Sequence, residues 1–128
     1  MKQIRVLLIG LGRMGNRFYE KFSEVGEERV KIVAVCETDP NNPNVIRAVE
    51  DGVVHYLSYR EAIEHYQEQI DIIMDTSNRP EVKQEIRQIL EKSGNRHTVL
   101  IPMVVDYLMW YLLPNAGEIP QDHREIGY

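Results

Sequence analysis

The sequence predicts a single α/β domain built on a doubly wound, mainly parallel sheet. Five short runs of apolar, often β-branched residues alternate with segments in which apolar residues recur at helical spacing. The first run also enters a glycine-rich turn, and a helical pattern leaves that turn. Strands that alternate with helices form a parallel sheet with helices on both faces. The 128 residues suffice for one such domain with a substantial core, but not for two ordinary domains.

The apolar runs predict strands at residues 5–9, 30–36, 53–56, 70–75 and 97–101. The second run is rich in β-branched residues, which favour strands. It ends before Asp39-Pro40, a dipeptide typical of loops. Asp51-Gly52 provides the turn that precedes the third run.

Helices are expected between these strands. The first follows Gly15 and ends at Gly26, which is a suitable C-cap. A short helix is expected at 44–50, and Ser58 is a good N-cap for the third. The fourth begins at Pro80 and ends at Gly94.

The fourth helix has a recognisable apolar face. Val82, Ile86, Ile89 and Leu90 recur at helical spacing. Lys83 is grouped with the other charged residues of this helix, away from the apolar face.

Composition and charge exclude several function classes. A net charge of −5 and a pI near 5.4 argue against general affinity for nucleic acid or an anionic membrane. The sequence has no apolar run of the roughly 20 residues needed to cross a bilayer, and its first residues lead straight into a strand, without a signal peptide. The single cysteine, Cys36, excludes an intramolecular disulfide and is expected to be a small buried hydrophobe rather than a redox-sensitive thiol. No histidine spacing indicates a metal site. These features predict a cytoplasmic protein.

The glycine-rich turn, Gly10-Leu11-Gly12-Arg13-Met14-Gly15, is the strongest functional signal. Gly10 lets the chain reverse, Gly12 leaves room for a pyrophosphate, and Gly15 lets helix and strand pack closely. The N–H groups at the start of the helix attract phosphate, and Arg13 and Met14 lie in that first turn. A strand, this turn and a helix together predict a dinucleotide-binding domain of the Rossmann type.

Glu37 supports the same interpretation. It ends the second strand roughly 22 residues after the last glycine, close to the ~20 expected for the acidic residue that binds the adenosine ribose. A carboxylate there repels a 2′-phosphate, and no Arg or Lys lies between Glu37 and Asn44, so NAD is favoured over NADP. Two alternatives remain: Glu37 is a solvated strand end, or the site binds S-adenosylmethionine, whose sites also combine a glycine-rich turn with an acidic strand end.

Residues 4–15 and 32–39 resemble the N-terminal domain of the glucose–fructose oxidoreductase and inositol dehydrogenase family. The resemblance runs from about residue 3 to 104. Homoserine and dihydrodipicolinate dehydrogenase-type domains are similar in pattern. The family resemblance implies an NAD(P)-binding domain of an oxidoreductase. It also implies that Thr76, Ser77 and Asn78, after the fourth strand, contact the cofactor near the nicotinamide ribose.

The sequence departs from this family at two points. The family follows its fifth strand with Glu-Lys-Pro, whose lysine serves catalysis, whereas this chain has Leu100-Ile101-Pro102. The family also has a second domain that carries the substrate pocket, and the sequence is too short to include one. Catalytic residues therefore stay unknown. We expect an NAD-binding module that serves as a cofactor-binding or redox-sensing subunit. The alternative is an oxidoreductase completed by another subunit or by a missing C-terminal domain.

The segment Met103 to Leu113 is almost wholly apolar, with Asp106 as its only charge. At about 11 residues it is too short to span a membrane, so we expect a terminal helix that is buried on more than one face. Burial against a second copy of the chain, as a homodimer, or against a partner subunit would cover it. The alternative is complete burial in the chain's own core. The predicted organisation is thus a dinucleotide-binding domain at 1–113 and a polar tail at 114–128.

Overall fold

One parallel sheet forms the centre of the molecule. The computed structural model describes residues 2–120. Its strands are β1 (Ile4–Ile9), β2 (Val30–Cys36), β3 (His55–Tyr56), β4 (Ile72–Asp75) and β5 (Val99–Leu100). They lie in the order β3-β2-β1-β4-β5, and every pair is parallel. The predicted fold class, a doubly wound α/β domain, is confirmed.

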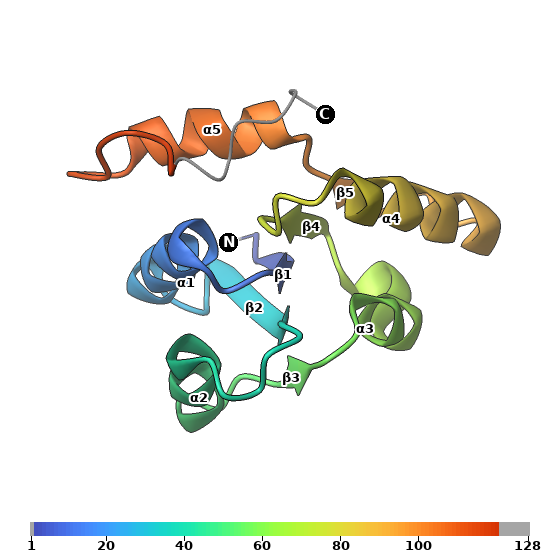
Figure 1. The fold of residues 1–128 in the computed structure, drawn as a ribbon. Coiled ribbons are helices and arrows are strands. Elements are labelled where there is room, and N and C mark those ends of the chain that lie inside the picture. The colour runs from blue at the N-terminus through green and yellow to red at the C-terminus, as the bar shows by residue number, and fades with distance from the viewer. Residues whose placement is uncertain (1, 121–128) are drawn as a thin grey trace.

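The helices lie on both faces of this sheet. They are α1 (Arg13–Val25), α2 (Pro43–Glu50), α3 (Tyr59–Tyr66), α4 (Pro80–Ser93) and α5 (Met103–Leu112), with a short 3₁₀ turn at Gln67–Gln69. Figure 1 shows α1 and α2 on one face of the sheet and α3 and α4 on the other, with α5 extending beyond β4 and over α1.

Alternation along β1 divides the core into two halves. Val6 and Leu8 pack with α1, α2 and Trp110 of α5, whereas Leu7 and Ile9 pack with α3 and α4. All four side chains are almost completely buried. Because successive side chains of a strand point to opposite faces, one central strand supports both halves of the core.

Element types agree with the sequence, but the outer strands are shorter than expected. β3 covers residues 55–56 instead of 53–56, and β5 covers 99–100 instead of 97–101. Each of these strands pairs with one neighbour only, so fewer hydrogen bonds extend it. The predicted caps are present: Gly94 ends α4 in the left-handed conformation, and Ser58 Oγ accepts a hydrogen bond from the Glu61 N–H.

Helix α5 packs through one face only. Met103, Asp106 and Trp110 are buried, and the Trp110 ring lies edge-on to Phe18 of α1 with centroids 6.3 Å apart. The opposite face is exposed: Val104 by 55%, Leu108 by 59%, Tyr111 by 62% and Leu112 by 74%. The alternative of complete burial in the chain's own core is therefore wrong. Burial of the second face against another subunit stays a prediction.

The segment after α5 contains no helix or strand between residues 113 and 120. It folds back on α5, where Trp110 Nε1 donates a hydrogen bond to the Gly117 carbonyl. The rest of the predicted polar tail, 121–128, lies outside the described residues. No helix among residues 2–120 is long and apolar enough to cross a membrane.

Candidate functional site

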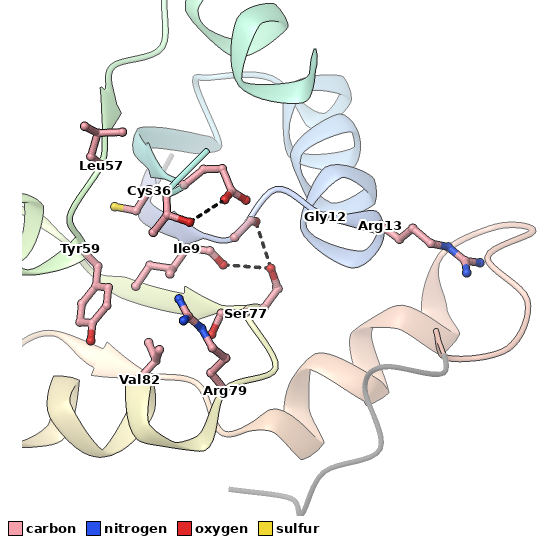
Figure 2. Close-up of a pocket in the computed structure, with 13 residues that line it drawn as sticks. Ile9, Gly12, Arg13, Cys36, Leu57, Tyr59, Ser77, Arg79 and Val82 are labelled. Carbon is pink, nitrogen blue, oxygen red and sulfur yellow. Dashed lines mark hydrogen bonds between the residues drawn. The ribbon is translucent and has the colours of Figure 1, made fainter. Parts of the chain in front are cut away.

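A pocket of about 390 Å³ opens at the carboxyl ends of β1, β2 and β4. We call it the rim pocket. Its lining residues include Gly10, Gly12, Glu37, Leu57, Ser77 and Arg79. Figure 2 shows that they come from segments far apart in the sequence. The strand order reverses between β1 and β4, because β2 and β3 lie on one side of β1 and β4 and β5 on the other. The crevice at such a point is where open α/β sheets bind ligands.

The glycine turn forms one wall of the rim pocket and has the geometry that its sequence predicts. Gly10 has a φ of +88°, and its N–H donates to the Cys36 carbonyl at 2.8 Å. A Cβ at Gly15 would lie 1.9 Å from the Gly10 oxygen, so only glycine fits there. A Cβ at Gly12 would meet nothing within 4 Å, which leaves open space beside the turn. A group such as a pyrophosphate fits this opening.

Helix α1 presents free N–H groups at the same place. The first hydrogen bond inside the helix runs from the Asn16 N–H to the Gly12 carbonyl at 2.9 Å, and no side chain caps the helix. The N–H groups of Arg13, Met14 and Gly15 precede that bond and have no partner inside the helix. The Met14 side chain is fully buried, so this residue offers a ligand its backbone alone. Figure 2 shows the Arg13 side chain extending away from the pocket.

Glu37 closes the other side of the glycine turn. Its Oε1 accepts the Leu11 N–H at 3.0 Å, and its Oε2 accepts the Asp39 N–H at 3.3 Å and the Thr38 hydroxyl at 3.4 Å. The carboxylate is therefore held at the rim by backbone donors. A carboxylate has about four lone-pair positions, so it can accept further hydrogen bonds from ligand hydroxyls.

The segment of residues 76–78, which we call the 76–78 loop, faces the glycine turn from β4. Thr76 is buried, and its hydroxyl lies 2.9 Å from the Ile9 carbonyl and 3.0 Å from the Gly10 carbonyl. Its side chain thus joins the two strand ends. Ser77 Oγ and Asn78 Oδ1 are buried and lack a hydrogen-bond partner among the described residues. Asn78 also has a φ of +58°. Unpaired polar atoms of this kind suit a ligand that supplies donors.

Arg79 is a further cation at this pocket. It lines the pocket, and Figure 2 shows its side chain extending toward Ile9. Among residues 2–120 its guanidinium has no ion-pair partner. Leu57, Tyr59 and Val82 complete the apolar wall. Arg79 follows Asn78 in the sequence and was expected to face this crevice, whereas the three residues of the apolar wall were not assigned to the site, because their place depends on how distant loops meet at the rim.

Two titratable groups that line the pocket keep their protons at neutral pH. Burial raises the pKa of the Cys36 thiol to about 12. Burial, followed by a hydrogen bond to Glu85, raises the pKa of Tyr59 to about 12. Cys36 is therefore the small buried hydrophobe that the sequence predicts, and it is not an activated nucleophile. The described residues contain no group of three His, Cys, Asp or Glu side chains that could hold a metal ion.

A buried ion pair lies next to the 76–78 loop and is hydrogen-bonded to it. Lys83 Nζ lies 2.9 Å from both Asp75 Oδ2 and the Asp75 carbonyl, and Asp75 Oδ1 accepts the Ser77 N–H at 2.9 Å. Asp75 is 0% exposed and Lys83 is 3% exposed. The helical pattern places Lys83 away from the apolar face of α4, yet the structure buries it. A buried carboxylate at the end of β4 needs a cation to balance its charge. Lys83 on α4 is close enough to supply one.

Solved structures share this fold. The WlbA dehydrogenase from Chromobacterium violaceum, in complex with NADH and UDP-GlcNAcA, matches 84% of this chain with a TM-score of 0.53 and 19% sequence identity. The myo-inositol 2-dehydrogenase from Lactobacillus plantarum matches 83% of it with a TM-score of 0.52 and 21% identity. The chain spans 39% and 38% of those two proteins. No family model and no curated protein matches the sequence.

These comparisons confirm the resemblance to inositol dehydrogenase-type proteins at the level of the fold. The matched part has a Rossmann-type α/β fold, and it corresponds to less than half of either neighbour. At such low sequence identity the likeness assigns no ligand to individual residues of this chain.

Proposed function

We propose that this chain is a nicotinamide dinucleotide-binding module and that the rim pocket is its binding site. The observation that carries the proposal is the glycine turn, where a Cβ is excluded at Gly15 but open space lies beside Gly12. The proposed contacts are backbone N–H groups of Gly12, Arg13, Met14 and Gly15 for the pyrophosphate. Thr76, Ser77 and Asn78 would border the nicotinamide ribose, and Gly10 would shape the turn. Such a cofactor, when bound, supplies hydride-transfer chemistry.

The preferred dinucleotide is NAD rather than NADP. Glu37 is held at the pocket by the Leu11 N–H, where its remaining lone pairs can accept the ribose hydroxyls. A 2′-phosphate at that position would meet a carboxylate. Since Arg79 extends from the start of α4, on the β4 side of the pocket, we assign it to the pyrophosphate or nicotinamide half and not to a 2′-phosphate. The NADH complex of one structural neighbour is consistent with this preference.

As a module, the chain would present or sense the cofactor without turning it over. Ile101 occupies the position where the resembling family has its catalytic lysine. Cys36 and Tyr59, which line the pocket, both hold their protons at neutral pH because their pKa values are raised to about 12. Neither can act as a base. We therefore propose a cofactor-binding or redox-sensing subunit, located in the cytoplasm, where the free thiol of Cys36 stays reduced.

A second candidate is an oxidoreductase whose substrate site is completed by another polypeptide segment or subunit. It is favoured by the lengths of the structural neighbours, of which this chain spans 39% and 38%. NADH oxidation against a panel of small aldehydes, ketones and imines tests for catalysis by the chain itself. Turnover by the purified chain would favour the enzyme, and binding without turnover would favour the module over an enzyme completed by a second copy of the chain.

The exposed face of α5 supports self-association as a homodimer. Val104, Leu108, Tyr111 and Leu112 are more than half exposed and occupy one side of the helix. Exposed apolar patches of this kind mark interaction sites. Leu108→Glu should shift the mass in solution from dimer to monomer. Ile46→Glu, at a 48%-exposed apolar position on α2, should leave it unchanged. A monomeric parent protein would refute this interface and favour a different partner subunit.

The direct test of the site is calorimetric titration with NADH. Gly12→Ala adds a methyl group in the open space without touching the protein, so it should weaken binding at least tenfold while the fold persists. Glu28→Gln removes an exposed carboxylate near the opposite end of β2 and should bind as the parent does. Equal affinity for the parent and the Gly12 variant would contradict the proposed site.

A further inference from the structure

Three buried ionisable side chains from three elements interact electrostatically. They are Asp75 at the end of β4, Lys83 on α4 and Asp106 on α5, and we call them the buried charge cluster. Their exposed fractions are 0%, 3% and 0%. None of them lines the rim pocket. The proposed function leaves this cluster without a role.

The members of the cluster are unequally paired. Both hydrogen bonds that Lys83 forms go to Asp75, one to its carboxylate and one to its carbonyl. Asp106 is buried just as deeply, yet neither of its carboxyl oxygens has a hydrogen-bond partner among the described residues. The cluster therefore contains one cation and two carboxyl groups. Because a buried and unpaired negative charge is costly, the cluster is best balanced when Asp106 carries a proton.

The surroundings of Asp106 agree with a protonated state. Burial raises the pKa of Asp106 to about 8, Asp75 adds to the rise, and Lys83 opposes it. These two residues are the charged groups that act on Asp106 from β4 and α4. From α1, the contact with α5 is the apolar Phe18 ring, while Arg17 bonds the Pro114 carbonyl beyond the helix end.

Asp106 also occupies a mechanically important position. It is one of three buried residues that attach α5 to the domain, together with Met103 and Trp110. On its other side, the cluster is joined to the rim pocket, because Asp75 Oδ1 accepts the Ser77 N–H at 2.9 Å. A change at Asp106 can thus reach α5 directly and the 76–78 loop through Lys83 and Asp75.

We propose that Asp106 is a proton-dependent latch: α5 stays docked on the domain while Asp106 is protonated, and deprotonation of this buried side chain releases the helix and loosens the 76–78 loop. The first part of this proposal concerns α5 alone. The second part, a loss of cofactor affinity, rests on the proposed function.

The latch has a defined pH window. Once α5 is released, Asp106 meets water and titrates near 4, as an ordinary aspartate does. An acidic group whose pKa is higher in the docked state than in the released state favours docking most strongly when the pH is below both pKa values. The released fraction then rises about tenfold for each pH unit between roughly 4 and 8, and it levels off above 8. Docking is therefore strongest in acid and weakest above pH 8.

Trp110 provides a direct readout, because it is the only tryptophan and lies buried on α5. The experiment measures Trp110 emission and the amide hydrogen-exchange protection of residues 103–112 from pH 5 to 9, with intrinsic exchange rates removed. In the parent protein, protection should fall about tenfold per pH unit up to pH 8. Asp106→Asn and Asp106→Leu, which cannot ionise, should show no such slope. Glu91→Gln, an exposed carboxylate on α4, should behave as the parent does.

The same variants test the link to the rim pocket. NADH affinity of the parent should fall as the pH rises toward 8, while that of Asp106→Asn should stay level. If the hydrogen-exchange protection of residues 103–112 changes with pH in the same way in the parent and in both Asp106 variants, the latch is overturned. An exchange slope that is lost in the variants, without NADH binding at any pH, would support the latch and contradict the proposed function. NADH affinities that stay parallel between parent and variant would overturn the coupling to the 76–78 loop.

Discussion

The two halves of the rim are built by different means. On the β1–α1–β2 side, the rim is formed mainly by the backbone. Gly10, Gly12 and Gly15 shape a turn, and free N–H groups face the opening. On the β4–α4 side, the 76–78 loop is bonded to a buried ion pair between Asp75 of β4 and Lys83 of α4. The first half depends on the absence of side chains, and the second on their pairing. Substitutions should therefore act locally in the first half and through stability or pH in the second.

The largest effect is expected at Lys83. Lys83→Met leaves Asp75 as an uncompensated buried charge and should lower the free energy of unfolding by about 3–5 kcal/mol in urea titrations. The double variant Asp75→Leu/Lys83→Met removes both charges and should recover much of this loss. A loss below about 1 kcal/mol in the single variant would mean that Lys83 is exchanging with solvent.

The next effect is the pH dependence that Asp106 imposes on stability. Its pKa is raised in the folded chain to about 8, so the folded state binds more protons than the unfolded state between pH 4 and 8. Stability should fall through that window by about 1.4 kcal/mol per pH unit relative to Asp106→Asn. Urea titrations of both proteins at pH 5, 6, 7 and 8 give this difference. A constant difference would show that Asp106 is ionised throughout.

A smaller effect separates the glycines of the turn. Gly15→Ala places a Cβ against the Gly10 oxygen and should cost about 1–3 kcal/mol of stability. Gly12→Ala meets nothing and should cost less than about 1 kcal/mol, since the change affects only the helix N-cap. Thermal unfolding of the two variants and the parent protein measures both stability losses. Equal losses would contradict the close packing of α1 against the end of β1.

The smallest effect is expected at Glu37, where selectivity should change more than stability. Glu37→Gln keeps an acceptor for the ribose hydroxyls but removes the charge that repels a 2′-phosphate. The ratio of NADH to NADPH affinity should fall about tenfold, the equivalent of about 1.4 kcal/mol. Calorimetric titration with both dinucleotides measures the ratio. Glu28→Gln serves as the control, and an unchanged ratio in Glu37→Gln would mean that the carboxylate does not face the adenosine ribose.

The first half of the rim could be predicted from sequence because its determinants are close together in the chain. The order strand, glycine turn and helix follows from spacing between residues 5 and 25, and Glu37 follows from its distance to Gly15. The helix ends at Gly26 and Gly94 were predicted for the same reason: a glycine after an apolar periodic segment is a local signal.

In the second half, the family resemblance indicated the 76–78 loop, but the charges that support it could not be predicted, because they come from distant segments. The pattern of α4 places Lys83 away from its apolar face, and nothing nearby in sequence indicates Asp75 as its partner. The sequence predicted that one side of α5 packs on the sheet, but the segment is apolar all round, and hydrophobicity alone does not show which side that is. Asp106, the single charge in this segment, gave no sign by itself that it is buried.

The most direct test of the account is calorimetric titration of the whole chain with NADH, NADPH and S-adenosylmethionine at pH 6.5, where Asp106 is protonated and α5 is docked. We predict that each chain binds one NADH, binds NADPH more weakly and does not bind S-adenosylmethionine. Binding of S-adenosylmethionine without either dinucleotide, or no binding of any of the three, would contradict the assignment of the rim pocket to a nicotinamide dinucleotide.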